Sequence, residues 1–171
     1  MNKVNHISWT LGLSLWIFYL YFDFSLVHSM IYSFFCASIA WLPDVDLKII
    51  KKINEFNRST LFLFYPLTFI FKILFKHRSI THSIWIPLCL FFISEYVLIS
   101  GISRVILLII SLAIFLHIFE DTLTVRGVEI FYPFSLRIRF LRFHTDSKIH
   151  FYILEFCAYF ILIAFIFANK I

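Results

Sequence analysis

Long apolar runs alternate with short polar stretches along this chain. A helix needs about 20 apolar residues to cross the ~30 Å hydrocarbon core of a bilayer. Runs close to that length lie at about 7–22, 25–43, 83–100, 103–120 and 150–168. A sixth run, about 61–75, is shorter, contains proline and is bracketed by basic residues, so we expect it to be re-entrant or interfacial. The pattern predicts an all-α, polytopic membrane bundle with about five transmembrane helices.

Composition agrees with this class. The 171 residues are 61% hydrophobic and include 24 Phe but only 3 Gly, and the mean hydropathy is +0.91. These values exclude an ordinary soluble domain. We therefore predict a single integral membrane domain over residues 1–171.

Basic residues fall mainly on one side of the predicted topology. If 61–75 does not cross, counting the spans places most of them on the side of the N-terminus: Lys3, Lys48, Lys51, Lys52, Arg58, Lys72, Lys76, Arg78, Arg126, Arg137, Arg139, Arg142 and Lys148. Only Arg104 and Lys170 fall on the opposite side. Because cytoplasmic loops are enriched in Lys and Arg, we expect a multi-pass protein of the cell (inner) membrane with the basic side in the cytoplasm.

Three polar clusters lie where apolar runs meet this basic side. The first is Pro43-Asp44-Val45-Asp46, whose two carboxylates offer hard oxygen ligands to a metal ion. Solvated loop acids or a helix cap would explain the same spacing equally well. The second cluster runs from His77 to Ser83, and the third from His117 to Asp121. Ionisable side chains near hydrocarbon need a partner, so we expect the three clusters to meet.

The third cluster has a spacing that can hold an ion. Residues i and i+4 lie on one face of a helix, so His117 and Asp121 can point at the same ion, while Glu120 is expected to point elsewhere. The alternative is a His–Asp ion pair at a helix end, where the helix dipole favours a cationic His. His6, at the start of the first run, is a further candidate, although a lone His there is more often an interfacial or capping residue.

Together these positions form a nitrogen and oxygen ligand set without a thiolate: His6, Asp44, Asp46, His77, His82, His117 and Asp121. Such a set suits a divalent metal, with zinc first and manganese or iron as alternatives. Seven ligands exceed the needs of one ion, so we expect two. Paired ions recur in phosphoester hydrolases, where they activate water and hold the charge of an in-line displacement.

Arginines near these clusters suggest an anionic substrate. Arg78 lies between two candidate ligands and suits phosphate because its planar fork makes paired hydrogen bonds; an ion pair to Asp44, Asp46 or Asp121 is the alternative. We assign catalysis to Arg78, Asp46 and His82. The segment 122–149 predicts a short hairpin or flap, in which Arg126, Arg137 and Arg139 would contact substrate and anionic lipid headgroups. Nucleic acid is not expected, and the oligomeric state stays open.

The three clusters also resemble a known family. The similarity lies in Leu42-Pro43-Asp44-Val45-Asp46, in His77-Arg78-Ser79-Ile80-Thr81-His82-Ser83, in the spacing His117, Asp121, Thr124, Gly127 and Val128, and in Pro133-Phe134-Ser135. In this order they resemble the YdjM family of membrane-bound, metal-dependent hydrolases. The resemblance implies ligands at the His and Asp positions above, and more distantly an analogy to zinc phospholipase C and P1-type nucleases. Leu47 stands where the family commonly has His, and Ser79 where it often has Gly.

The leading functional hypothesis is therefore hydrolysis of a lipid-linked ester, in first place a phosphoester, at the cytoplasmic leaflet. A metal transporter or metal sensor is the alternative, but transport sites usually lie near the bilayer midplane. A non-catalytic adaptor would explain the basic flap but not the ligand set. His28 and Glu95, on the far side, are expected to pair with each other or with Asp23.

Overall fold

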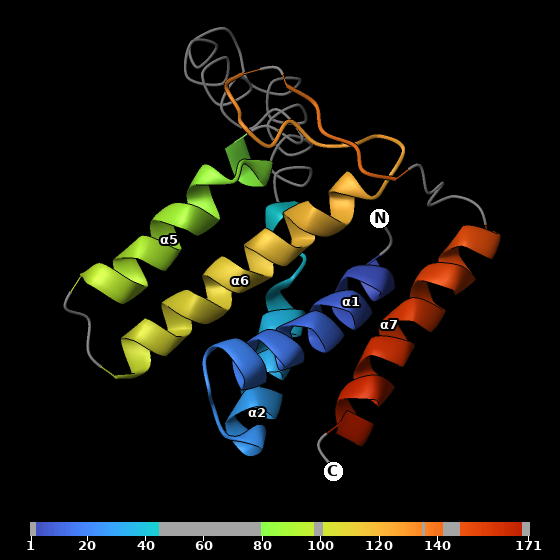
Figure 1. Ribbon diagram of the computed structural model, residues 1–171. Coiled ribbons are helices and arrows are strands. Elements are labelled where there is room, and N and C mark those ends of the chain that lie inside the picture. The colour runs from blue at the N-terminus through green and yellow to red at the C-terminus, as the bar shows by residue number, and fades with distance from the viewer. Residues whose placement is uncertain (1–2, 45–79, 98–100, 135, 142–147, 169–171) are drawn as a thin grey trace, which may run out of the picture.

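The computed structural model describes residues 3–44, 80–97, 101–134, 136–141 and 148–168. Five α-helices form these parts of the chain, together with short 3-10 and π turns and one isolated β-bridge (Figure 1). The all-α prediction is confirmed for the described residues. The predicted sixth run, 61–75, lies outside them.

The first two helices form an antiparallel hairpin. α1 (Lys3–Trp16) continues into a π-helical turn, η1 (Ile17–Tyr21). The chain then reverses at Asp23, whose φ of 53° lies in the left-handed region that Asp tolerates better than most residues. Ser25 caps α2 (Leu26–Ile39) by accepting a hydrogen bond from a backbone N–H of its first turn. The polar turn between the first two apolar runs therefore lies where the sequence predicts it.

α2 ends at the first polar cluster. The 3-10 turn η2 (Leu42–Asp44) follows it and contains Pro43, which lacks the N–H that an α-helix would need there. The second polar cluster ends in another 3-10 turn, η4 (Ile80–His82), which contacts η2 and leads into α5 (Trp85–Tyr96). In the predicted span 83–100 the helix α5 thus begins only at Trp85, because the turn after η4 takes up residues 83 and 84, and it ends at Tyr96.

The last two helices carry the longest apolar faces. α6 (Ile102–Thr122) begins after Gly101, and α7 (Lys148–Ala168) ends the described chain. α7 is attached to the first helix by a hydrogen bond from the Trp16 indole N–H to the Ile161 carbonyl, 3.0 Å long.

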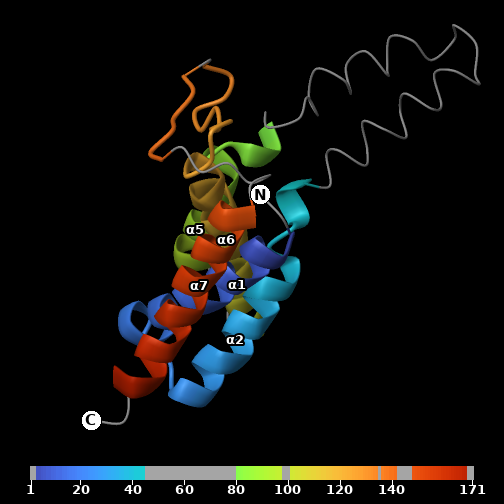
Figure 2. The ribbon, with the colours of Figure 1, turned by 90° about the vertical axis from the view of Figure 1, so that its right-hand side faces the viewer.

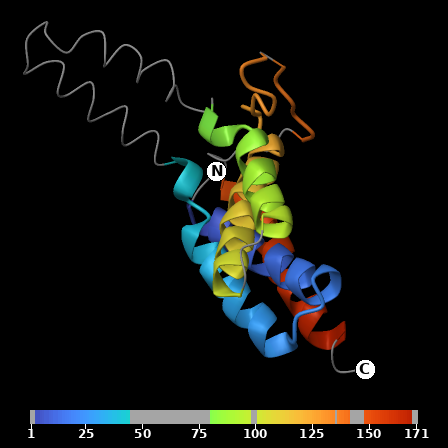
Figure 3. The same cartoon turned by 90° about the vertical axis from the view of Figure 1, so that its left-hand side faces the viewer.

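α1 and α6 occupy the middle of the bundle. α6 contacts α5, α2 and α1, while α1 contacts α2 and α7. Figure 2 shows α7 running alongside α1, and Figure 3 shows α5 and α6 side by side on the opposite flank. In Figure 1 the start of α1, the end of α2, the start of α5 and the end of α6 all lie at the upper end. The three polar clusters are therefore brought to one end of the bundle.

Two segments of the described chain are long and apolar enough to cross a membrane. They are Leu26–Asp44, with 19 residues, and Ile102–Thr122, with 21 residues. α5 has 12 residues, and the regular part of α1 has 14, so each is shorter than the ~20 residues that a crossing requires. The prediction of about five transmembrane helices is therefore not confirmed by helix length and composition.

Small and hydroxylic residues allow the helices to pack closely. They are buried along the facing sides of α1, α2 and α6: Thr10, Ser14, Ser29, Ser33, Ala37, Ser111 and Ala113. Such residues let helix backbones approach each other in a bilayer, where lipid tails are as apolar as Leu. One buried cluster joins three elements through Phe18, Cys36, Ile109 and Ala113.

A flap, defined as residues 123–134 and 136–141, follows α6 and lies at its upper end in Figure 1. Val128 and Ile138 form an antiparallel bridge with N···O distances of 3.2 and 2.9 Å. Gly127 precedes the bridge with a φ of 59°, a conformation favourable for glycine. The Ile130 carbonyl accepts a hydrogen bond of 2.9 Å from the Ile84 N–H, which ties the flap to the start of α5. Among the described residues the predicted hairpin is therefore present as a bridge between Val128 and Ile138, with turns and a bend over residues 130–134.

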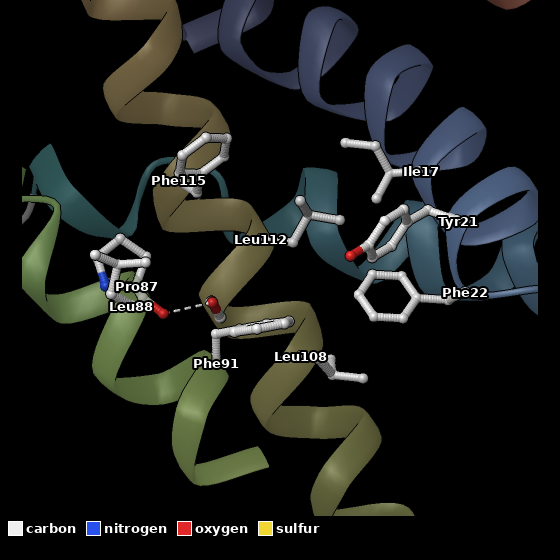
Figure 4. Close-up of a pocket in the computed structure, with 10 residues that line it drawn as sticks. Ile17, Tyr21, Phe22, Pro87, Leu88, Phe91, Leu108, Leu112 and Phe115 are labelled. Atoms are coloured by element: carbon white, nitrogen blue, oxygen red, sulfur yellow. Dashed lines mark hydrogen bonds between the residues drawn. The ribbon is translucent and has the colours of Figure 1, made fainter. Parts of the chain in front are cut away.

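An apolar cavity of about 230 Å³ lies along another face of α6 (Figure 4). Its walls come from η1, α5 and α6: Ile17, Tyr21, Phe22, Pro87, Leu88, Phe91, Leu108, Ser111, Leu112 and Phe115. Successive residues of a helix are about 100° apart, so His117 lies about 200° around α6 from Phe115. The cavity is therefore separate from the polar clusters.

The expected pairing of His28 with Glu95 or Asp23 is wrong. Glu95 forms a two-point ion pair with Arg104 across the turn between α5 and α6, with N···O distances of 2.6 and 3.3 Å. The His28 ring bonds the Ser25 hydroxyl at 2.7 Å within the cap of its own helix. Partners close in sequence therefore satisfy both side chains.

Candidate metal centre

Five ionisable side chains from four different elements converge at the end of the bundle where the polar clusters meet. They are His6 of α1, Asp44 of η2, His82 of η4, and His117 and Asp121 of α6. The three His and Asp121 are no more than 1% exposed, whereas the Asp44 side chain is 27% exposed. The structure thus joins the predicted clusters into one site with a single partly open side at Asp44.

Four of these side chains form a small cage. The Nε2 atoms of His82 and His117 are 3.3 Å apart. Asp44 Oδ1 lies 3.6 Å from His82 Nε2 and 3.7 Å from His117 Nε2. Asp121 Oδ2 lies 3.7 and 4.0 Å from the same two nitrogens. These N···O distances exceed the 2.7–3.2 Å of a protein hydrogen bond, so the cage leaves space between its members.

A hydrogen bond at the outer ring nitrogen sets how His117 faces the cage. Its Nδ1 lies 2.8 Å from the Ala40 carbonyl oxygen. A carbonyl can only accept, so Nδ1 carries the proton, and a neutral ring then presents the lone pair of Nε2 inward. A lone pair aimed at a second imidazole nitrogen and two carboxylates is the arrangement of a metal ligand.

His6 adds a fifth group, whose ring nitrogen lies within 4.8 Å of ligand atoms of Asp44 and His117. Its ring stacks on that of His117, with centroids 4.1 Å apart. His6 Nε2 is buried and has no hydrogen-bond partner in the part of the chain that the structure describes, and it lies 3.8 Å from Asp121 Oδ1. Asp121 therefore directs one oxygen toward His6 and the other toward the cage. A buried nitrogen without a partner costs about 1–3 kcal/mol, which a bound cation would remove.

Glu120 is the residue that the sequence reasoning missed. It was expected to point elsewhere, but Glu120 Oε2 lies 2.6 Å from His6 Nδ1, and Oε1 accepts a hydrogen bond of 3.0 Å from the Thr10 hydroxyl. Its side chain is fully buried. A carboxylate so close to the end of an apolar helix was itself a signal, because ionisable residues in membrane segments are functional candidates by default.

Six further residues predicted for the site are not among these five. Asp46, His77 and Arg78 fall outside the described residues. Arg126, Arg137 and Arg139 are exposed on the flap, and Arg137 pairs with Glu129 at 3.1 Å. The structure therefore brings together five of the seven predicted ligands and places the three flap arginines at the surface of the same end.

Comparison with known proteins decides the family. A family model described as YdjM inner membrane protein matches residues 1–170. The chain belongs to the YdjM family. No curated protein and no solved structure matches it. The family description agrees with the two candidate spans of this YdjM chain, so the resemblance and the prediction of an inner-membrane protein are confirmed.

Three large apolar side chains on the elements next to the YdjM site are exposed. Leu42 of η2 and Ile80 of η4 are 40% and 37% exposed, and Trp85 at the start of α5 is 49% exposed. Because η2 and η4 are in contact, two of these exposed side chains lie on neighbouring turns.

Proposed function

We propose that this YdjM protein is a metal-dependent hydrolase that cleaves a lipid-linked phosphoester at the cytoplasmic leaflet of the inner membrane. The observation that carries the proposal is the spacing of the cage. A tetrahedral zinc site, with ligand distances of about 2.0–2.2 Å, holds its ligand atoms about 3.3–3.6 Å apart. The separation of His82 from His117, and those of both His from the two Asp, are 3.3 to 4.0 Å, so these nitrogen–nitrogen and nitrogen–oxygen separations are close to those of a tetrahedral site.

The donor set supports zinc. Two imidazole nitrogens and two carboxylate oxygens, with no thiolate, are ligands that zinc accepts, and manganese or iron would accept them as well. An ion held there supplies Lewis acidity toward a phosphoryl oxygen and activates water. We assign His82, His117, Asp44 and Asp121 to this first ion.

The position of Asp121 supports a second ion. One of its oxygens faces His82 and His117, and the other faces the unpaired Nε2 of His6, as a carboxylate that bridges two ions would do. His117 has a single inward lone pair and can serve one ion. We therefore propose that a second ion would use His6 and Asp121 with further ligands from Asp46 and His77.

A lipid substrate fits the surroundings of the opening. Exposed Leu42 and Ile80 would accept acyl chains beside Asp44, while Arg126 and Arg139 on the flap would hold the anionic headgroup. Arg78, within the second polar cluster, is proposed to bind the phosphate with paired hydrogen bonds. We assign catalytic roles to Arg78 and Asp46 together with the ligand His82.

The proposed topology has five crossings. α1 with η1, α2, α5, α6 and α7 alternate in direction along the bundle, and the metal centre lies at the end that carries the flap arginines. The positive-inside rule would place that end in the cytoplasm. In this arrangement η1 lengthens the first helix and η4 precedes the short α5.

A metal transporter or sensor is the second candidate. Asp44 ends the first candidate span, and Asp121 lies next to the last residue of the other. The ligands therefore gather at one end of the bundle, whereas transport sites usually lie at mid-depth. This placement favours the hydrolase.

The test uses purified protein in detergent, analysed for metal content and for cleavage of phosphatidic acid, phosphatidylglycerol and a diacylglycerol that lacks phosphate. We expect zinc to co-purify and phosphate-bearing lipids to be cleaved. Asp121→Asn and His82→Ala should lose both metal and activity, whereas Glu95→Gln, at the far end, should lose neither. Metal binding without cleavage of any lipid, together with zinc uptake by reconstituted vesicles, would establish the transporter instead.

Variants of Arg78 test separately whether this arginine binds the substrate phosphate. Arg78→Lys should keep the metal but lose much of the activity, because a point charge cannot reproduce paired hydrogen bonds. If Arg78→Ala lowers metal content together with activity, the arginine supports the ligands and does not bind substrate.

A further inference from the structure

We propose that Glu120 is a positioning residue of the metal centre, which holds the His6 ring with Nδ1 protonated and Nε2 free to bind an ion. The inference rests on the proposed function, which supplies the metal. It assigns a role to a carboxylate that touches neither the cage nor the opening.

The contacts of Glu120 are suited to this role. One carboxylate oxygen lies 2.6 Å from His6 Nδ1, and the other accepts from the Thr10 hydroxyl at 3.0 Å. When Glu120 is ionised its carboxylate can only accept, and the imidazole proton then lies on Nδ1. The Nε2 atom then carries the lone pair, and this is the buried nitrogen that has no hydrogen-bond partner among the described residues.

The position of Glu120 explains how α6 can supply both a metal ligand and the acceptor that orients His6. Asp121 faces the ions from α6, while the preceding residue points about 100° around the helix toward α1, which packs against α6. His6 and Thr10 are four residues apart and so lie on one face of α1. A single turn of α6 thus supplies a ligand to the ion and a hydrogen-bond acceptor to the ligand on the neighbouring helix.

A carboxylate behind a ligating His has a known physical effect. It fixes the tautomer and the ring orientation and raises the basicity of the ligand, and its loss typically lowers metal affinity 10- to 100-fold. A purely structural Glu120 would stabilise the contact between α1 and α6, and its effect on metal affinity would not depend on the His6 ring.

A double-mutant cycle separates these two roles, because interaction energies between residues appear as non-additivity. Zinc affinity is measured by competition with a chromogenic chelator in detergent, for the full chain. We expect Glu120→Leu to lower the affinity about 10- to 100-fold, and Glu120→Gln, which keeps an acceptor, to have a smaller effect. In a His6→Ala background Glu120→Leu should change the affinity by less than about twofold.

Thr10→Val provides a second test, which keeps the Glu120 carboxylate and removes only the hydroxyl that orients it. Its matched control is Ser14→Ala, because the Ser14 hydroxyl is buried on the same helix but bonds its own Leu11 carbonyl at 3.3 Å. We expect Thr10→Val to weaken zinc binding and Ser14→Ala to leave it unchanged. If a Glu120 variant does not fold, the comparison of Thr10→Val with Ser14→Ala decides whether Glu120 positions His6.

The outcomes distinguish this inference from the proposed function. If the wild-type protein binds zinc and the Glu120 effect is the same with and without His6, the positioning role is overturned and the metal centre stands. If the wild-type protein binds no divalent metal, both fail. Nitrogen NMR of His6 in the wild-type protein is a further check, and a proton on Nε2 instead of Nδ1 would contradict the role of Glu120.

Discussion

Replacing Gly127 by alanine tests how the two arms of the flap are held against each other. A non-glycine residue in the left-handed region, where Gly127 has a φ of 59°, costs about 1–2 kcal/mol. The new Cβ would also overlap the Ile138 carbonyl oxygen and the stem of Arg139. Relieving this overlap breaks the two hydrogen bonds between Val128 and Ile138, each worth about 0.5–1.5 kcal/mol. The expected loss of stability is therefore about 2–5 kcal/mol.

Gly101 offers a matched control. Its φ of 64° is similar and a Cβ there would meet no atom within 4 Å, but its ψ of −128° lies outside the left-handed helical region. Gly101→Ala should therefore cost only backbone strain, of about 1–3 kcal/mol. For a chain of this size 1 kcal/mol shifts the unfolding midpoint by about 2–4 °C. Thermal unfolding in one detergent should therefore show a larger fall in Tm for Gly127→Ala than for Gly101→Ala. Equal shifts would refute the argument that Ile138 and Arg139 lie tightly against Gly127.

Three further outcomes are expected. Ser111→Ala removes a buried hydrogen bond of 2.7 Å to the Pro87 carbonyl on the facing helix, and it should lower the free energy of unfolding by about 0.6–1.7 kcal/mol. Ser94→Ala, whose hydroxyl bonds its own helix, should lower it less, as measured by chemical unfolding. Chelation of the metal should lower stability by about 2.7 kcal/mol when the free metal had been at 100 times its Kd, and an unchanged Tm in a protein shown to have lost its metal would contradict a buried centre. Single cysteines at Arg126 and at Arg104, in a cysteine-free background, should react from opposite sides of intact cells, with an impermeant reagent reaching only the Arg104 position.

Local rules predicted the parts of the site that lie on one element. The spacing of His117 and Asp121 placed both on one face of α6, and they do reach the same neighbours. Pro43 marked the end of α2, and the polar turn after the first apolar run has the expected place. These features follow from helix periodicity and backbone chemistry, which the sequence displays directly.

Contacts between helices could not be predicted in the same way. Glu120 was assigned away from the site because its own helix turns it away from Asp121, but α1 packs there and supplies His6 and Thr10. Glu95 was paired with a residue of α2, whereas the turn after α5 brings Arg104 within reach. Hydrophobic periodicity shows which face of a helix is buried but not which helix covers it.

The order in which the ligands leave the ribosome follows from the separation of His6 and Asp121 along the chain. Four helices of the described bundle must be synthesised before the last cage residue exists, because Asp121 lies near the end of α6. A nascent chain that has exposed only His6 and Asp44 holds two of the five converging groups, and metal binding is coupled to the folding that assembles the full set. Under the proposed function, acquisition of the metal would be a late event of biosynthesis, and a chain that stops before α6 would be expected to stay metal-free.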